Sequence, residues 1–83
     1  MSMDRQEKFD KLIERMELPE NKARRNPTVF SEADTTIARN VADMRECLTK
    51  LNDTARQDTH FIGIQFDQKY DEVVQILDEE GWA

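Results

Sequence analysis

The chain has 83 residues, of which 37% are hydrophobic and 36% are charged, and its formal net charge at pH 7 is −6. A single cysteine excludes an intramolecular disulfide framework and a multi-cysteine metal site. The sequence contains no apolar run of the roughly 18 residues that a membrane span needs. These totals predict one small all-α domain over residues 1–83, cytoplasmic, with no cofactor, no metal and no membrane contact.

The first predicted helix covers residues 3–18. Phe9, Leu12, Ile13 and Met16 recur at spacings of three and four, which places them on one side of a helix. Acidic and basic residues alternate on the remaining surface at the spacing that allows weak pairs within a helix. The apolar stripe is narrow, so we expect this helix to pack on one neighbour.

Residues 19–30 show no sustained period and contain both prolines, so they are predicted to form a basic loop. Arginine guanidinium groups next to the start of a helix can bind a phosphate or a carboxylate. The candidate site for a small anionic ligand, such as a nucleotide, consists of Lys22, Arg24, Arg25, Asn26 and Thr28. The alternative is a solvated loop that pairs with acidic side chains, and the loop lacks the glycine-rich pattern of a phosphate-binding loop.

The longest regular pattern predicts a helix over residues 31–57. Ser31 is a favourable N-cap, and Asp34 follows three residues later, as in a capping box. Apolar residues then alternate in steps of four and three, the pattern of a coiled-coil or bundle seam. The seam consists of Ile37, Val41, Met44, Leu48, Leu51 and Ala55. Because a chain this short buries a limited core by itself, we expect a homo-oligomer.

A further helix is predicted over residues 59–80. Ile62, Phe66, Tyr70, Val73 and Leu77 step by four or three, and Gly81 is a plausible stop. No glycine or proline lies between Pro27 and Gly63, so two arrangements remain open. The favoured one is a short N-terminal helix packed across an antiparallel helical hairpin. The other is one long kinked helix from residue 31 to 80, and either is expected to assemble as an oligomeric bundle.

The negative charge is concentrated at the C-terminal end. Residues 58–83 contain seven acids and one lysine, a balance of −6 that equals the net charge of the whole chain. Direct nucleic-acid binding is therefore not expected. We expect a non-enzymatic inhibitor or adaptor that contacts a basic or apolar protein surface through this helix. The candidate contact residues are Tyr70, Asp71, Glu72, Asp78, Glu79 and Trp82.

No group of residues matches a catalytic signature. His60 is the only histidine, and a general base needs an orienting partner in a pocket. Cys47 flanks the apolar seam and is expected to be a small core residue rather than a reactive thiol. The alternative function, sequestration of a small anion by an oligomer, rests on the basic loop.

Overall fold

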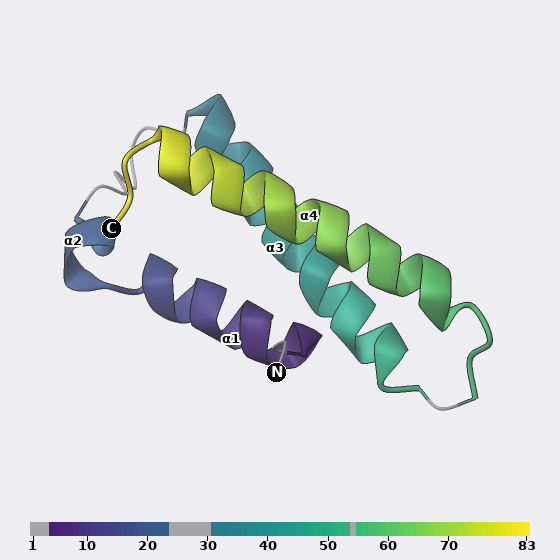
Figure 1. Ribbon diagram of the computed structural model, residues 1–83. Coiled ribbons are helices and arrows are strands. Elements are labelled where there is room, and N and C mark those ends of the chain that lie inside the picture. The colour runs from purple at the N-terminus through teal and green to yellow at the C-terminus, as the bar shows by residue number, and fades with distance from the viewer. Residues whose placement is uncertain (1–3, 24–30, 54) are drawn as a thin grey trace.

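The structure is a computed structural model that describes residues 4–23, 31–53 and 55–83 (Figure 1). These ranges contain helices and no strand: α1 (Arg5–Met16), α2 (Pro19–Lys22), α3 (Glu32–Leu51) and α4 (Thr59–Glu79). Helices α3 and α4 lie side by side along most of their length, and α1 packs against one side of this pair and contacts both helices (Figure 1). The all-α prediction is confirmed for the described residues.

Helix α1 begins at a capped end and stops earlier than predicted. The Asp4 carboxylate accepts a hydrogen bond from the Glu7 backbone N–H at 2.8 Å, which satisfies one of the free donors of the first turn. The helix ends at Met16, two residues before the predicted end at 18.

The expected loop over residues 19–30 begins instead with the short helix α2. Pro19 occupies its first turn, where the missing N–H of proline costs no hydrogen bond. The prediction of a loop is therefore wrong for Pro19–Lys22, because proline was taken as a stop signal and not as a start. Residues 24–30 lie outside the described residues.

Helix α3 confirms the predicted start and corrects the predicted end. The Asp34 N–H donates to Ser31 Oγ at 3.1 Å, and the Ser31 N–H donates to Asp34 Oδ2 at 3.1 Å, a reciprocal capping box. The helix ends at Leu51, six residues before the predicted 57. Beyond it, the Asp53 carboxylate accepts the Ala55 N–H at 3.0 Å, a local bond that competes with helix continuation. Ala55 is exposed and is not part of the seam.

Helix α4 covers almost the predicted range and ends at the predicted glycine. Gly81 adopts φ 74°, and its N–H donates to the Asp78 carbonyl at 3.2 Å. The Trp82 N–H donates to the Leu77 carbonyl at 2.9 Å, which completes a Schellman motif. A side chain other than glycine is disfavoured at this positive φ, so Gly81 fixes the end of α4.

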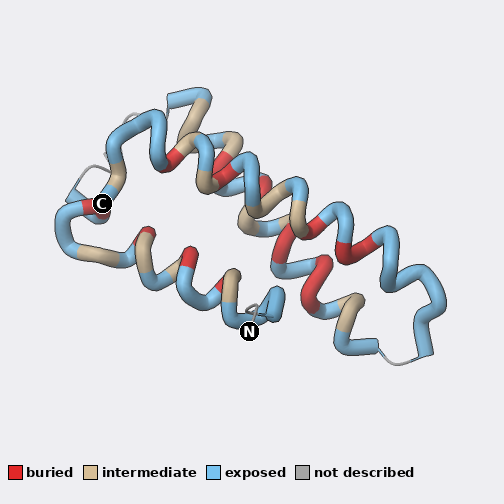
Figure 2. Tube along the Cα trace, viewed as in Figure 1, coloured by how far each residue is buried: buried red, intermediate tan, exposed pale blue. Residues whose placement is uncertain are grey.

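The hydrophobic core lies between α1, α3 and α4. Figure 2 shows the buried residues on the sides of these helices that face one another. The Phe9 ring of α1 lies against the Phe66 ring of α4, with 6.5 Å between centroids. Val41 and Leu51 of the predicted seam are partly buried against this core. Its buried members are Phe9, Leu12, Met16, Ile37, Met44, Cys47, Leu48, Ile62, Phe66, Val73 and Leu77. The seam of α3 is thus covered within one chain.

Candidate interaction surface

Helix α4 presents one continuous side to solvent, opposite the side that packs into the core. A helix turns by about 100° per residue, so residues spaced by three, four and seven share this side. On the side of α4 away from the core, the residues at these spacings are exposed. The outer stripe of α4, as we call it, consists of Phe61, Ile64, Gln65, Gln68, Asp71, Glu72, Gln75 and Glu79.

The first turns of α4 give the outer stripe an apolar end. Phe61 is 72% exposed and Ile64 is 41% exposed, and these are the exposed large hydrophobic residues within the described ranges. The His60 ring meets the Phe61 ring edge-on, with 6.4 Å between centroids. Single exposed apolar residues are common, but two on adjacent turns beside an imidazole form a small patch.

The second half of the outer stripe is acidic and carries no basic residue. Asp71 and Glu72 are exposed, and within the described part of the chain neither has an ion-pair partner. Glu79 accepts a hydrogen bond from Gln75 Nε2 at 3.1 Å, which leaves its charge uncompensated. The lysine of α4, Lys69, reaches Asp43 of α3 at 3.5 Å instead. These three carboxylates therefore present a net charge of −3 to solvent.

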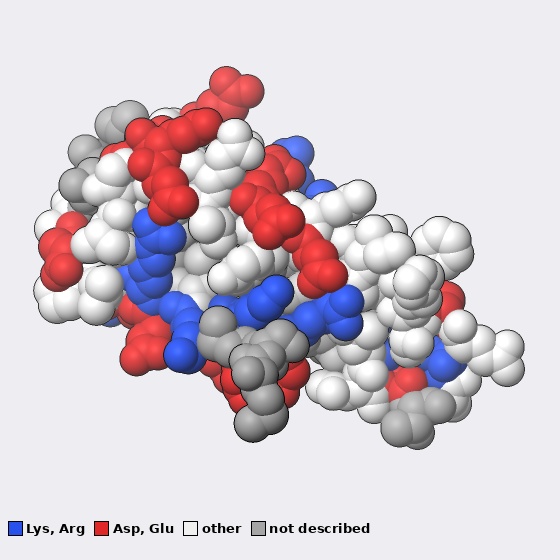
Figure 3. Space-filling model, viewed as in Figure 1, with Lys and Arg blue, Asp and Glu red and all other residues white. Residues whose placement is uncertain are grey.

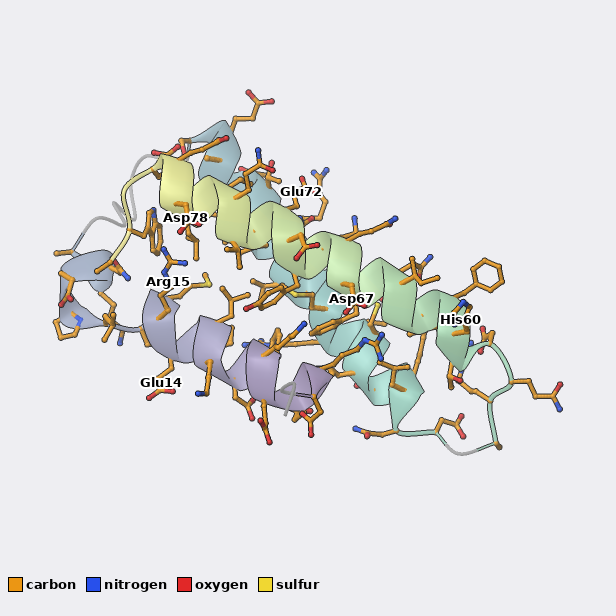
Figure 4. The ribbon with its side chains drawn as sticks, in the orientation of Figure 1. Glu14, Arg15, His60, Asp67, Glu72 and Asp78 are labelled. Atoms are coloured by element: carbon orange, nitrogen blue, oxygen red, sulfur yellow. The ribbon has the colours of Figure 1, made fainter. Side chains whose placement is uncertain are left out.

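The acids of α4 that face α1 are paired, in contrast to those of the outer stripe. Arg5 donates to both carboxylate oxygens of Asp67 at 3.1 and 3.0 Å, and Arg15 reaches Asp78 Oδ1 at 2.8 Å. Figure 3 shows basic side chains in a row along α1 beneath the acids of α4, and Figure 4 shows Arg15 and Asp78 turned toward each other. The hydrogen bond and charge of Asp67 raise the pKa of the Arg5 guanidinium. The helical phase thus divides the acids of α4 into a paired set and a solvated set.

A polar cluster joins the residues that follow α4 to α1 and α2. Asn21 is fully buried: its Nδ2 donates to the Arg15 carbonyl at 2.7 Å, and its Oδ1 accepts the Ala83 N–H at 3.0 Å. Arg15 Nε also donates to the Ala83 carbonyl at 2.7 Å. Trp82 is partly buried against the core. This cluster holds the segment after α4 against the connection between α1 and α2.

The structure separates the six predicted partner-contacting residues. Asp71, Glu72 and Glu79 lie together on the outer stripe, whereas Asp78 pairs with Arg15. The prediction for Tyr70 and Trp82 placed them on a binding surface, but both side chains lie against the core.

Tyr70 is held between two neighbours. Its ring stacks on that of Phe66, with 6.4 Å between centroids and 15° between planes, and Lys8 Nζ lies 5.6 Å from its centroid. These contacts make Tyr70 a packing residue between α1 and α4.

The contact residues predicted from the sequence did not include the apolar end of the outer stripe. Phe61 and Ile64 lie out of phase with the buried series that runs through Ile62 and Phe66, so the period of α4 itself contained the signal.

The candidate anion site stays a prediction. Lys22 is exposed, and its Nζ pairs with Glu17 Oε2 at 2.9 Å. Arg24, Arg25, Asn26 and Thr28 lie outside the described residues.

The other polar groups of residues 4–23, 31–53 and 55–83 do not converge on one point. Among the described residues, no three His, Cys, Asp or Glu side chains gather as metal ligands would. Burial raises the pKa of the Cys47 thiol, which is the opposite of the shift that a reactive thiolate requires. An open groove of about 600 Å³ between α1 and the end of α3 carries balanced charges; it is lined by Asp4, Arg5, Gln6, Lys8, Leu48, Leu51, Asn52 and Asp67.

Comparison of the chain with protein-family models, with curated proteins and with solved structures found no match. Across the described residues, no helix has both the length and the apolar character needed to cross a bilayer.

Proposed function

We propose that the protein is a non-enzymatic inhibitor or adaptor of the cytoplasm that binds another protein through the outer stripe of α4. Its partner presents a basic or apolar surface. Asp71, Glu72 and Glu79 are its acidic contacts, and Phe61 and Ile64, rather than Tyr70 and Trp82, are its apolar contacts.

The observation that supports this function most directly is the composition of the outer stripe. It combines an aromatic ring that is 72% exposed with three acids and no lysine or arginine. Exposed aromatic residues dominate the binding energy of many interfaces, while charges of one sign raise association rates and select the partner.

The acids at the end of α4 also disfavour the helix on which they lie. The C-terminal end of a helix carries a partial negative charge, and α4 has no basic residue in its last turn. An exposed acid there costs about 0.3–1 kcal/mol. Arg15 offsets this for Asp78, but Glu79 receives only an amide hydrogen bond from Gln75. Cations of a partner would compensate the helix end and the acids together.

We further propose that the antiparallel hairpin of α3 and α4 self-associates into an oligomeric bundle. A chain of 83 residues buries only about 60–65% of its unfolded surface, which favours association. The seam of α3 is covered by α1 and α4, so contacts between copies would lie on other surfaces of the chain. Light scattering coupled to size exclusion tests this: a mass above 9.8 kDa supports association, and a mass of one chain contradicts it.

Partner capture tests the binding function. We compare Asp71→Lys/Glu72→Lys with the control Glu14→Lys/Glu20→Lys, which changes the net charge equally at exposed positions of α1 and α2. Figure 4 shows Glu14 pointing away from α4 and Glu72 on the side of α4 opposite α1. A protein retained by the wild type and by the control, but lost from the α4 variant, supports the function. Equal retention by both variants contradicts it.

A further inference from the structure

Building on the proposed function, we propose that the outer stripe binds one amphipathic helix of the partner, antiparallel to α4, with a basic N-terminal half and an apolar C-terminal half.

The shape of the outer stripe is long and narrow. From Phe61 to Glu79 it covers 18 steps of the helix, or about 27 Å at 1.5 Å per residue. Its members occupy one side of a single helix, which forms a ridge rather than a pocket. Ridges of side chains on one helix pack into the grooves of another helix along such a length.

The side chains follow a fixed order along this ridge. The apolar pair Phe61 and Ile64 comes first, two glutamines follow, and the acids begin at Asp71. Asp71 lies seven positions after Ile64, which is about 10 Å along the axis. A matching helix therefore needs apolar residues at one end and cations about two turns away on the same side.

The direction of α4 selects the orientation of its partner. The acids Glu72 and Glu79 lie toward the C-terminal end of α4, where the helix dipole is also negative. An antiparallel partner places its positive N-terminal end and its cations over these acids. Its C-terminal half then meets Phe61 and Ile64.

A second copy of this chain does not fit the outer stripe. Two parallel stripes place Glu72 opposite Glu72, and two antiparallel stripes place Phe61 opposite Glu79. The exposed side of α3 offers Arg39 to the acids, whereas the Arg45 guanidinium lies 5.8 Å from the centroid of the Phe9 ring of α1. Within the described ranges, however, Phe61 and Ile64 are themselves the exposed large hydrophobic residues, so α3 has none to receive them. The occupant is therefore a helix of another protein.

Two synthetic peptides test the inference with the full chain. The first carries Lys and Arg on one side of its N-terminal half and Leu on the same side of its C-terminal half, and the second has the two halves exchanged. We expect the first to bind at least about tenfold more tightly in fluorescence anisotropy, and to gain helical circular dichroism on binding. Phe61→Ser and Asp71→Lys/Glu72→Lys should each weaken it by about tenfold, and Glu14→Lys/Glu20→Lys by less than about twofold.

The outcomes separate the two proposals. Tighter binding of the second peptide overturns the orientation. If neither peptide binds while partner capture still depends on Asp71 and Glu72, the helical partner is wrong and the proposed function stands. If the first peptide binds all variants equally and capture is also unchanged, both are wrong.

Discussion

Replacement of Asn21 by alanine should lower the free energy of unfolding far more than is usual for a residue in a short connection between helices. The Asn21 amide is fully buried and joins the Arg15 carbonyl to the Ala83 N–H through hydrogen bonds of 2.7 and 3.0 Å. Each such bond contributes about 1 kcal/mol, and removal of the fully buried amide also leaves unfilled volume in the interior. We therefore expect a loss of about 2–3 kcal/mol in the free energy of unfolding.

This loss is large for a domain of this size. Domains have stabilities of about 0.05–0.15 kcal/mol per residue, which gives roughly 4–12 kcal/mol for this chain. A loss of 2–3 kcal/mol should lower the Tm by about 10–20 °C, since each kcal/mol shifts a domain of this length by about 4–8 °C. Urea unfolding followed by circular dichroism measures the change directly.

The matched control is Asn52→Ala, the same replacement at an exposed residue after α3. It should change the free energy of unfolding by less than about 0.5 kcal/mol. If Asn21→Ala changed the stability as little as Asn52→Ala, the polar cluster would not hold the C-terminal segment against α1 and α2.

Three further predictions concern the packing. Asn40 is 3% exposed and its Nδ2 has no hydrogen-bond partner, so Asn40→Leu should raise the free energy of unfolding by about 1–2 kcal/mol in urea titrations; a loss of stability would contradict this. A Cβ at Gly63 would lie 2.8 Å from the movable Arg5 guanidinium. Gly63→Ala should therefore raise the free energy of unfolding by about 0.5 kcal/mol in the wild type and by about 1 kcal/mol in the Arg5→Ala variant, each relative to its own parent. Equal gains in the two backgrounds would exclude the clash. Burial raises the pKa of the Cys47 thiol, so its preference for the neutral form stabilises the fold below the ordinary thiol pKa and is lost as the pH rises through the raised value. Iodoacetamide at pH 8 should therefore modify native Cys47 at least about tenfold more slowly than the urea-unfolded chain, and equal rates would show an accessible thiolate.

Local signals in the sequence predicted the regular parts of the fold. Ser31 and Asp34 marked the start of α3 because both capping bonds are formed by residues three apart. Gly81 marked the end of α4 because only glycine adopts its positive φ without strain.

The end of α3 and the helix α2 were not predictable in the same way. Nothing in the composition of residues 52–57 forbids a helix, and α3 stops where the side chain of Asp53 takes the Ala55 N–H. Pro19 is compatible both with the end of one helix and with the start of another. Choosing between such alternatives requires the tertiary contacts.

In the candidate site, too, local patterns identified some residues and could not identify others. The acidic residues of the outer stripe were identified by charge, and the period of α4 also contained the exposure of Phe61. By contrast, the pairing of Asp78 with Arg15 joins residues 63 positions apart, and the burial of Asn21 depends on Ala83. Local patterns carry no information about such distant contacts.

Chemical-shift mapping identifies the surface of the chain that contacts a partner helix. The uniformly labelled full chain is titrated with the peptide that has a basic N-terminal half and an apolar C-terminal half, and the backbone amide shifts are followed. We expect the largest changes to follow the outer stripe from Phe61 to Glu79, while the amides of α1 on the side of Glu14 stay unchanged. Changes centred on Lys22, with none on α4, would contradict it.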